Sequence, residues 1–130
     1  MRRPHPLLLA LPLALLLQAA SAAPLPAAAR AEIEALLARL QASGCEFNRN
    51  GSWHAGAEAR AHLLKKLDVM AGRGLVASAE QFIERGAASS SMSGQPYRVR
   101  CAGQVPVDSA PWLKAELQAL RAARAASSPR

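Results

Sequence analysis

The sequence predicts a small α+β domain, in which a two- to three-stranded antiparallel sheet packs with about four helices and one disulfide ties the chain. Four stretches repeat apolar residues at helical spacing, and two short stretches alternate apolar and polar residues. Two cysteines, Cys45 and Cys101, stand at the outer ends of the alternating stretches. The length allows one domain, which we expect over 23–130 and ordered over about 28–124.

Residues 1–22 have the layout of a secretory signal peptide. Arg2 and Arg3 precede an apolar run from Leu7 to Leu17, and Ala20-Ser21-Ala22 supplies the small residues of a cleavage site. The run is about 11 residues long, whereas a membrane span needs roughly 20, so an uncleaved anchor is disfavoured. We therefore expect an exported, periplasmic protein with no membrane span after cleavage.

The first helix is expected over residues 27–42, and Gly44 is its natural stop. Its large apolar residues recur at i, i+3, i+4 and i+7 and form one stripe: Ile33, Leu36, Leu37 and Leu40.

A β-hairpin follows the first helix. Residues 45–49 alternate, and Asn50-Gly51 is the strongest two-residue hairpin signal because both residue types accept positive φ at low cost. Trp53 opens the short return strand. Trp53 and Tyr97 would favour a sugar ligand only if both were exposed on one face; otherwise they fill the core.

Two helices are expected before the last strand. The first covers about 55–71, and the second starts at Ser78, whose hydroxyl would accept the Gln81 amide in a capping box. We expect Gly86 to end this helix in the left-handed conformation.

A strand and a helix complete the chain. Residues 97–101 alternate as a half-buried strand, and a turn follows. Asp108 or Ser109 is expected to cap a last helix, whose tail frays from Ala125 onward.

Cys45 and Cys101 are expected to form a disulfide, because both belong to the exported part, where disulfides persist. Antiparallel neighbours place the start of one strand beside the end of the other. Residues 45–49 should therefore pair with 97–101, and 52–54 should lie on the other side of 45–49. This arrangement brings the two Cα atoms within the bridging limit of about 7 Å.

The exported part is basic, which would suit an anionic partner or would serve solubility alone. Residues 23–130 keep 14 of the 16 Lys and Arg residues and all nine acids, a net charge of +5. The chain has no block of five or more Lys and Arg and few aromatic residues to stack on bases. Nucleic-acid binding is therefore not expected.

Residues 86–94 form a loop rich in hydroxyl groups, with Ser90, Ser91 and Ser93 close together. Its amides and hydroxyls could hold a carboxylate or phosphate with help from nearby guanidinium groups. Three arginines flank the loop: Arg85, Arg98 and Arg100. The competing interpretation is that the serines bond their own backbone and shape a turn into Tyr97.

His62 is the one plausible base for a serine nucleophile, with Glu58 one turn earlier to orient it. Ser91 or Ser93 would be the nucleophile, but the Gly-x-Ser-x-Gly elbow and a Ser-x-x-Lys motif are absent. A serine hydrolase is therefore the alternative interpretation.

No metal and no cofactor are expected. His54 and His62 are eight residues apart, which is about 12 Å along a helix and too far to share one ion. The cysteines are committed to the disulfide.

Arg49 precedes the hairpin turn, whose geometry does not require an arginine. It would pair with Glu58, or it would line a site with His62 and the serine loop.

Four segments also resemble a known family. They are Phe47-x-Arg49-Asn50-Gly51, the helix with Glu58, His62-Leu63 and Lys66-Leu67, the segment Phe82-Ile83-Glu84, and Ser90-Ser91-x-Ser93-Gly94-x-Pro96-Tyr97. Over about 33–121 the chain resembles the YfeK-like family of small exported bacterial proteins, a domain of unknown function. The resemblance implies an exported location and a common small fold, and it brings no activity.

We interpret the chain as an uncharacterised exported protein whose leading function is non-catalytic binding or service as an envelope accessory. The expected partner is a small anionic ligand, an envelope polymer or an envelope protein. The alternatives are the serine hydrolase and a purely structural envelope factor. The expected binding surface has six residues: Arg49, His62, Ser90, Ser91, Ser93 and Tyr97.

Overall fold

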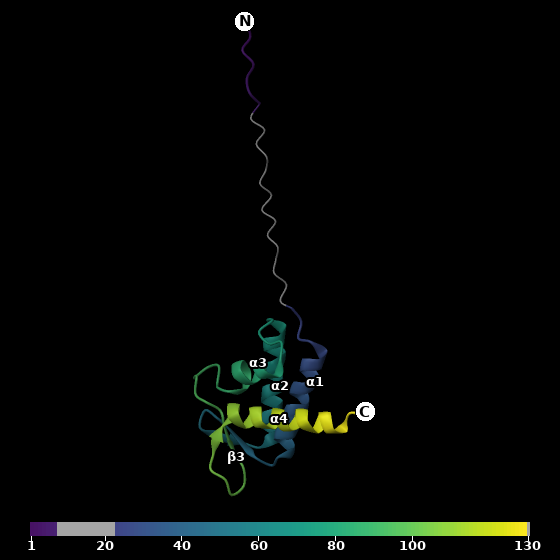
Figure 1. Ribbon diagram of the computed structural model, residues 1–130. Helices are drawn as coiled ribbons and strands as arrows, with labels where there is room; N and C mark the ends of the chain where they lie inside the picture. Colours follow the sequence, from purple (N-terminus) through teal and green to yellow (C-terminus); the bar gives the residue numbers. More distant parts are fainter. Residues whose placement is uncertain (8–22, 130) are drawn as a thin grey trace.

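The computed structural model of the chain describes residues 1–7 and 23–129. The expected signal peptide falls largely on residues 8–22, which lie outside the described residues. Residues 23–129 confirm the predicted α+β class, with helices packed together and a small sheet at one end of them (Figure 1).

The helices form one side of the core. The apolar stripe predicted for the first helix is confirmed, because its four large residues are fully buried. The first helix packs against the second and the last (Figure 1). The helical elements are α1 (Ala27–Ala42), α2 (Gly56–Gly72), α3 (Ala79–Phe82), the π-helical turn η1 (Ile83–Ala87) and α4 (Ser109–Ser127).

The sheet has four antiparallel strands in the order β2-β1-β3-β4 within the described residues. They are β1 (Glu46–Arg49), β2 (Ser52–His54), β3 (Arg98–Arg100) and β4 (Val107–Asp108). The predicted neighbours of β1 are confirmed, with Phe47 opposite both His54 and Val99. The fourth strand exceeds the two to three expected. It pairs Val107 with Val99 and includes Asp108, one of the two residues expected to cap the last helix.

The hairpin turn sets the direction of Arg49. Asn50 has φ 51° and Gly51 has φ 86°, as the turn signal predicts. Because side chains alternate along a strand, Arg49 shares the inner face with buried Cys45 and Phe47. Arg49 therefore points toward the helices at the turn end of the hairpin.

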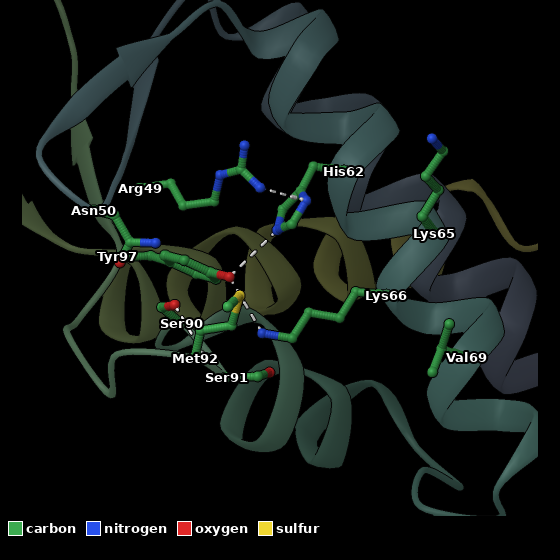
Figure 2. Close-up of a pocket in the computed structure, with 10 residues that line it drawn as sticks. All are labelled: Arg49, Asn50, His62, Lys65, Lys66, Val69, Ser90, Ser91, Met92 and Tyr97. Atoms are coloured by element: carbon green, nitrogen blue, oxygen red, sulfur yellow. Dashed lines mark hydrogen bonds between the residues drawn. The ribbon is translucent and has the colours of Figure 1, made fainter.

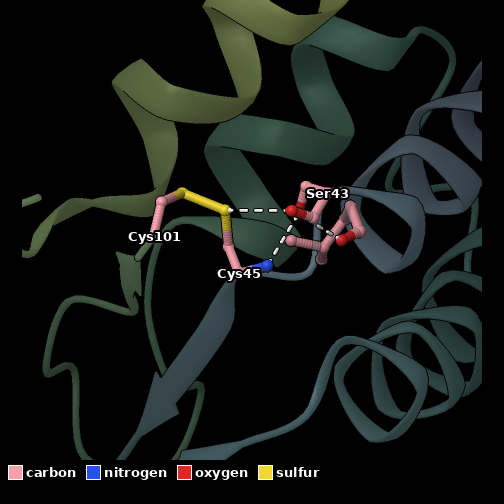
Figure 3. Close-up of a disulfide and its surroundings, with 4 residues drawn as sticks. Ser43, Cys45 and Cys101 are labelled. Carbon is pink, nitrogen blue, oxygen red and sulfur yellow. Dashed lines mark hydrogen bonds between the residues drawn. A yellow bond between two sulfur atoms is a disulfide. The ribbon is translucent and has the colours of Figure 1, made fainter. Parts of the chain in front are cut away.

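The predicted disulfide is present at the other end of β1. The Cys45 and Cys101 Cα atoms are 4.3 Å apart. Ser43 supports the bridge, because its hydroxyl donates to the Leu40 carbonyl at 2.6 Å and accepts the Cys45 amide at 3.1 Å (Figure 3).

The Ser78 cap at the start of α3 is confirmed, but the return bond from Gln81 reaches Ala77 instead of Ser78, and the end of that helix also differs from the prediction. The Ser78 hydroxyl accepts the Gln81 amide at 3.1 Å, and the Gln81 side chain accepts the Ala77 amide at 2.8 Å. Gly86 is not a left-handed cap: it lies inside η1, where a Cβ would come within 2.8 Å of the Met70 sulfur. A side chain at this position would therefore force the flexible Met70 side chain to shift.

Helix α4 begins at the predicted position, after Asp108, but it lacks the expected side-chain cap and ends later than predicted. The Asp108 side chain makes no capping hydrogen bond, and Ser109 is buried with its hydroxyl donating to the Ala87 carbonyl at 2.6 Å. The helix continues to Ser127, beyond the end expected near residue 124. Arg124 bonds Glu32 of α1 at 3.1 Å and so holds this last stretch.

Candidate functional site

A pocket of about 280 Å³ lies between α2, the hairpin turn and the loop that follows η1. Figure 2 shows the side chains around it. The hairpin contributes Arg49 and Asn50, α2 contributes His62, Lys65, Lys66 and Val69, and the loop contributes Ser90, Ser91, Met92 and Tyr97.

Helical spacing explains the wall formed by α2. His62, Lys66 and Val69 follow one another at i, i+4 and i+7, so they lie on one face of the helix. Leu63 and Leu67 are fully buried on the neighbouring face. The core contacts of α2 therefore hold the pocket face in place.

Arg49 and His62 form the first link of a hydrogen-bond chain. Arg49 Nη1 lies 3.0 Å from His62 Nδ1. A guanidinium group has only donors, so Nδ1 must accept with its lone pair. In the neutral imidazole the proton then sits on Nε2.

His62 is held neutral by its surroundings. Burial lowers the pKa of its imidazole, and the positive charges of Arg49 and Lys66 lower it further. Nε2–H therefore donates to the Tyr97 hydroxyl, 3.3 Å away (Figure 2).

Lys66 donates to the same hydroxyl from the other side. Its Nζ lies 3.2 Å from Tyr97 Oη and 3.0 Å from the Ser89 carbonyl. The ammonium also stands 5.0 Å from the centre of the Tyr97 ring, within cation–π range. Burial lowers the pKa of Lys66, because fewer water molecules solvate its charge.

The Tyr97 hydroxyl oxygen accepts hydrogen bonds from both His62 and Lys66. Its ring is buried against Phe47, with ring centres 5.0 Å apart. Burial raises the pKa of its phenol, an effect that Arg49 partly offsets, so the hydroxyl keeps its proton at neutral pH. Because Oη already accepts two hydrogen bonds, its own hydrogen is left to donate.

The serine loop is largely bonded to itself, as the turn interpretation proposes. The buried Ser90 hydroxyl accepts the Met92 and Ser93 amides, both at 3.3 Å. Ser93 donates to the Asn50 side chain at 2.6 Å, which fastens the loop to the hairpin. Ser91 is exposed on the pocket wall, whereas Ser93 is not part of that wall.

Several pairings expected from the sequence are wrong. Arg49 does not pair with Glu58; Glu58 instead lies 3.1 Å from His54 of β2. Glu58 therefore does not orient His62. Arg49 instead lines the pocket together with His62 and the serine loop, which was the second expectation for this residue.

The three flanking arginines are engaged elsewhere. Arg85 donates to the Leu75 carbonyl, Arg98 to the Pro106 carbonyl, and Arg100 pairs with Glu46 while covering the Trp53 ring. None of these three lines the pocket. Trp53 and the buried Tyr97 also do not share an exposed face, so the sugar interpretation gains no support.

Lys66 is the residue that sequence reasoning missed. The available signal was its i+4 spacing from His62 on α2, which puts both side chains on one face. Its neighbour Lys65 points away from the hydrogen-bonded side chains (Figure 2).

Two further features concern residues 1–7 and 23–129 only. These residues hold no group of three or more His, Cys, Asp and Glu side chains arranged to bind a metal ion. No helix among them combines the length and apolar character needed to cross a membrane.

Comparison with known proteins gives a family and no activity. The sequence profile described as "Family of unknown function (DUF5329)" matches residues 27–121. The chain is 44% identical over 68 residues to the "Uncharacterized protein YfeK" of Salmonella typhimurium strain LT2. This match covers 52% of the chain and 55% of the relative, about half of each. No solved structure matches the chain.

Proposed function

Because this chain belongs to the family of unknown function DUF5329, we propose its function from the pocket itself: non-catalytic binding of a small anionic ligand. The main support is the chain of hydrogen bonds from Arg49 through His62 and Tyr97 to Lys66. This series of hydrogen bonds leaves N–H and O–H donors at the polar end of the pocket, and it leaves no free lone pair on His62 there.

Two of these donors are free to reach a ligand. Lys66 has three N–H groups and uses two of them, and the Tyr97 hydrogen has no acceptor among the described residues. Both residues line the pocket. An anion there would replace the solvation that the Lys66 ammonium loses on burial.

The contacts do not favour the serine hydrolase. A general base needs a free lone pair within reach of the nucleophile. His62 has none, because Nδ1 accepts from Arg49 and Nε2 carries the proton given to Tyr97. Within residues 23–129, no serine hydroxyl bonds either ring nitrogen.

The anion proposal is tested by titrating residues 23–130 with sodium acetate and following amide resonances by NMR. We expect saturable shifts at the pocket residues. Lys66→Met should weaken binding by about 10- to 100-fold, because a charge-assisted hydrogen bond is lost. Lys114→Met is the matched control, since Lys114 is an exposed lysine of α4 that pairs with Glu84 outside the pocket. Equal affinity in the wild type and Lys66→Met, or no saturable shift, would contradict the proposal.

We also propose export to the periplasm. The disulfide supports it, because such bonds persist in oxidising compartments. Mass spectrometry of the protein recovered from a bacterial periplasm should find a chain beginning near residue 23. A chain that retains residues 1–22 and stays in the cytoplasm would contradict it.

A further inference from the structure

Two exposed apolar side chains line the anion pocket, one from α2 and one from the loop. Val69 lies on α2 with 54% of its surface exposed, and Met92 lies on the loop with 97% exposed. Single exposed apolar residues are ordinary on protein surfaces. Here, however, two of them line a pocket that has free donors at its polar end.

The walls between these two side chains are also apolar in character. The Tyr97 ring and the methylene stem of Lys66 contribute carbon surface, while the polar atoms of both gather at one end. Methionine is flexible and can fit against chains of different shape. The pocket therefore has a polar end that suits an anion and an open apolar end that suits hydrocarbon.

The polar end fits a carboxylate better than a phosphate. The free Lys66 N–H and the Tyr97 O–H can each meet one of two carboxylate oxygens. A phosphate has more oxygens and is commonly held by loop amides. Five of the loop amides are already used inside the loop, those of Ser90, Met92, Ser93, Gly94 and Gln95.

We propose that the pocket binds the carboxylate end of a single-chain aliphatic acid, with the hydrocarbon lying between Val69 and Met92. This inference rests on the proposed anion binding and specifies its ligand class. The pocket volume of about 280 Å³ lies at the small end of ligand pockets, so part of the chain extends into solvent.

The test is a calorimetric series with residues 23–130 and acetate, hexanoate, decanoate, decanol and inorganic phosphate as probes. Affinity should rise about 3- to 4-fold for each methylene that becomes buried. Decanoate should bind more tightly than decanol, and acetate at least as tightly as phosphate.

Two variants locate the hydrocarbon. Met92→Gln should reduce the gain in affinity from acetate to decanoate, because less hydrocarbon is then buried against the loop. Leu75→Gln is the control, since Leu75 is also an exposed apolar residue but lies outside the pocket lining.

The outcomes separate this inference from the proposed function. If acetate binds with dependence on Lys66 but chain length has no effect, the aliphatic class is wrong and anion binding stands. Decanol binding as tightly as decanoate, or phosphate binding more tightly than acetate, also overturns the inference. If no anion binds at the pocket, both proposals fall.

Discussion

At the scale of single residues, His62 joins the hairpin to the loop. Its two ring nitrogens have different partners, Arg49 on β1 and Tyr97 at the end of the serine loop. Only the neutral ring satisfies both, because protonated Nδ1 would place its hydrogen against the Arg49 donor. The protonation state of one imidazole therefore affects how the two walls of the pocket meet.

The lowered pKa of His62 predicts a stability that depends on pH. The unfolded chain takes up this proton near the ordinary value of about 6.5, while the folded chain resists it to lower pH. The unfolded state thus binds more protons below pH 6.5, and the free energy of unfolding falls as pH falls through that window. The contribution of His62 is fully present above pH 6.5.

Urea denaturation between pH 7.5 and pH 5 measures this effect. His62→Gln should show a smaller loss of stability over the range than the wild type. Identical pH dependence in the two proteins would show that His62 does not take up its proton in the way we describe.

Part of the site was predictable from the residues. Arg49 and Tyr97 follow from strand alternation, which points one toward the helices and buries the other. The partner of Arg49 was not predictable, because Glu58 and His62 both lie on α2, and Glu58 is taken by His54, four residues before it. Lys66 was missed because a lysine at the edge of an apolar face can turn inward or outward. Its inward direction is set by hydrogen bonds to the Ser89 carbonyl and the Tyr97 hydroxyl, which come from distant parts of the chain.

At the scale of elements, the packing of α1 against α2 depends on one glycine. A Cβ added to Gly56, the first residue of α2, would lie 2.9 Å from the Cα of Gln41 on α1. That atom belongs to the backbone and cannot rotate away. The two helices can approach this closely only because position 56 has no side chain.

Gly56→Ala should therefore lower the free energy of unfolding by about 1–3 kcal/mol through overpacking. The matched control is Gly72→Ala in the last turn of the same helix, where an added Cβ would point into open space. Alanine there should leave stability unchanged or raise it by up to about 1 kcal/mol. Urea denaturation of both variants decides the matter, and equal effects would refute the close-approach explanation.

Element starts were more predictable than element ends. The start of α3 is predicted by a local capping pattern at Ser78. The π-helical turn that follows depends instead on how Gly86 packs against Met70 and Phe82. The strand β4 has only two residues, too few to show alternation. Both features arise from tertiary contacts that a local pattern does not contain.

At the scale of the whole molecule, the disulfide joins residues 56 positions apart. Replacing both cysteines by alanine, Cys45→Ala with Cys101→Ala, should lower the free energy of unfolding by about 4 kcal/mol in the chain-entropy model. Urea denaturation of the double variant and the oxidised wild type measures the difference. Superimposable transitions would contradict the prediction.

The bridge also divides the molecule into a closed ring and two arms. Every residue of the pocket wall lies between Cys45 and Cys101, while α1 and α4 lie outside this stretch. All lining residues of the binding site thus belong to a covalent macrocycle. Helices α1 and α4 pack against this macrocycle but contribute no residue to the pocket wall. A protease that cut the exposed 91–96 segment would open the ring without releasing a fragment, because the two pieces would remain joined through sulfur.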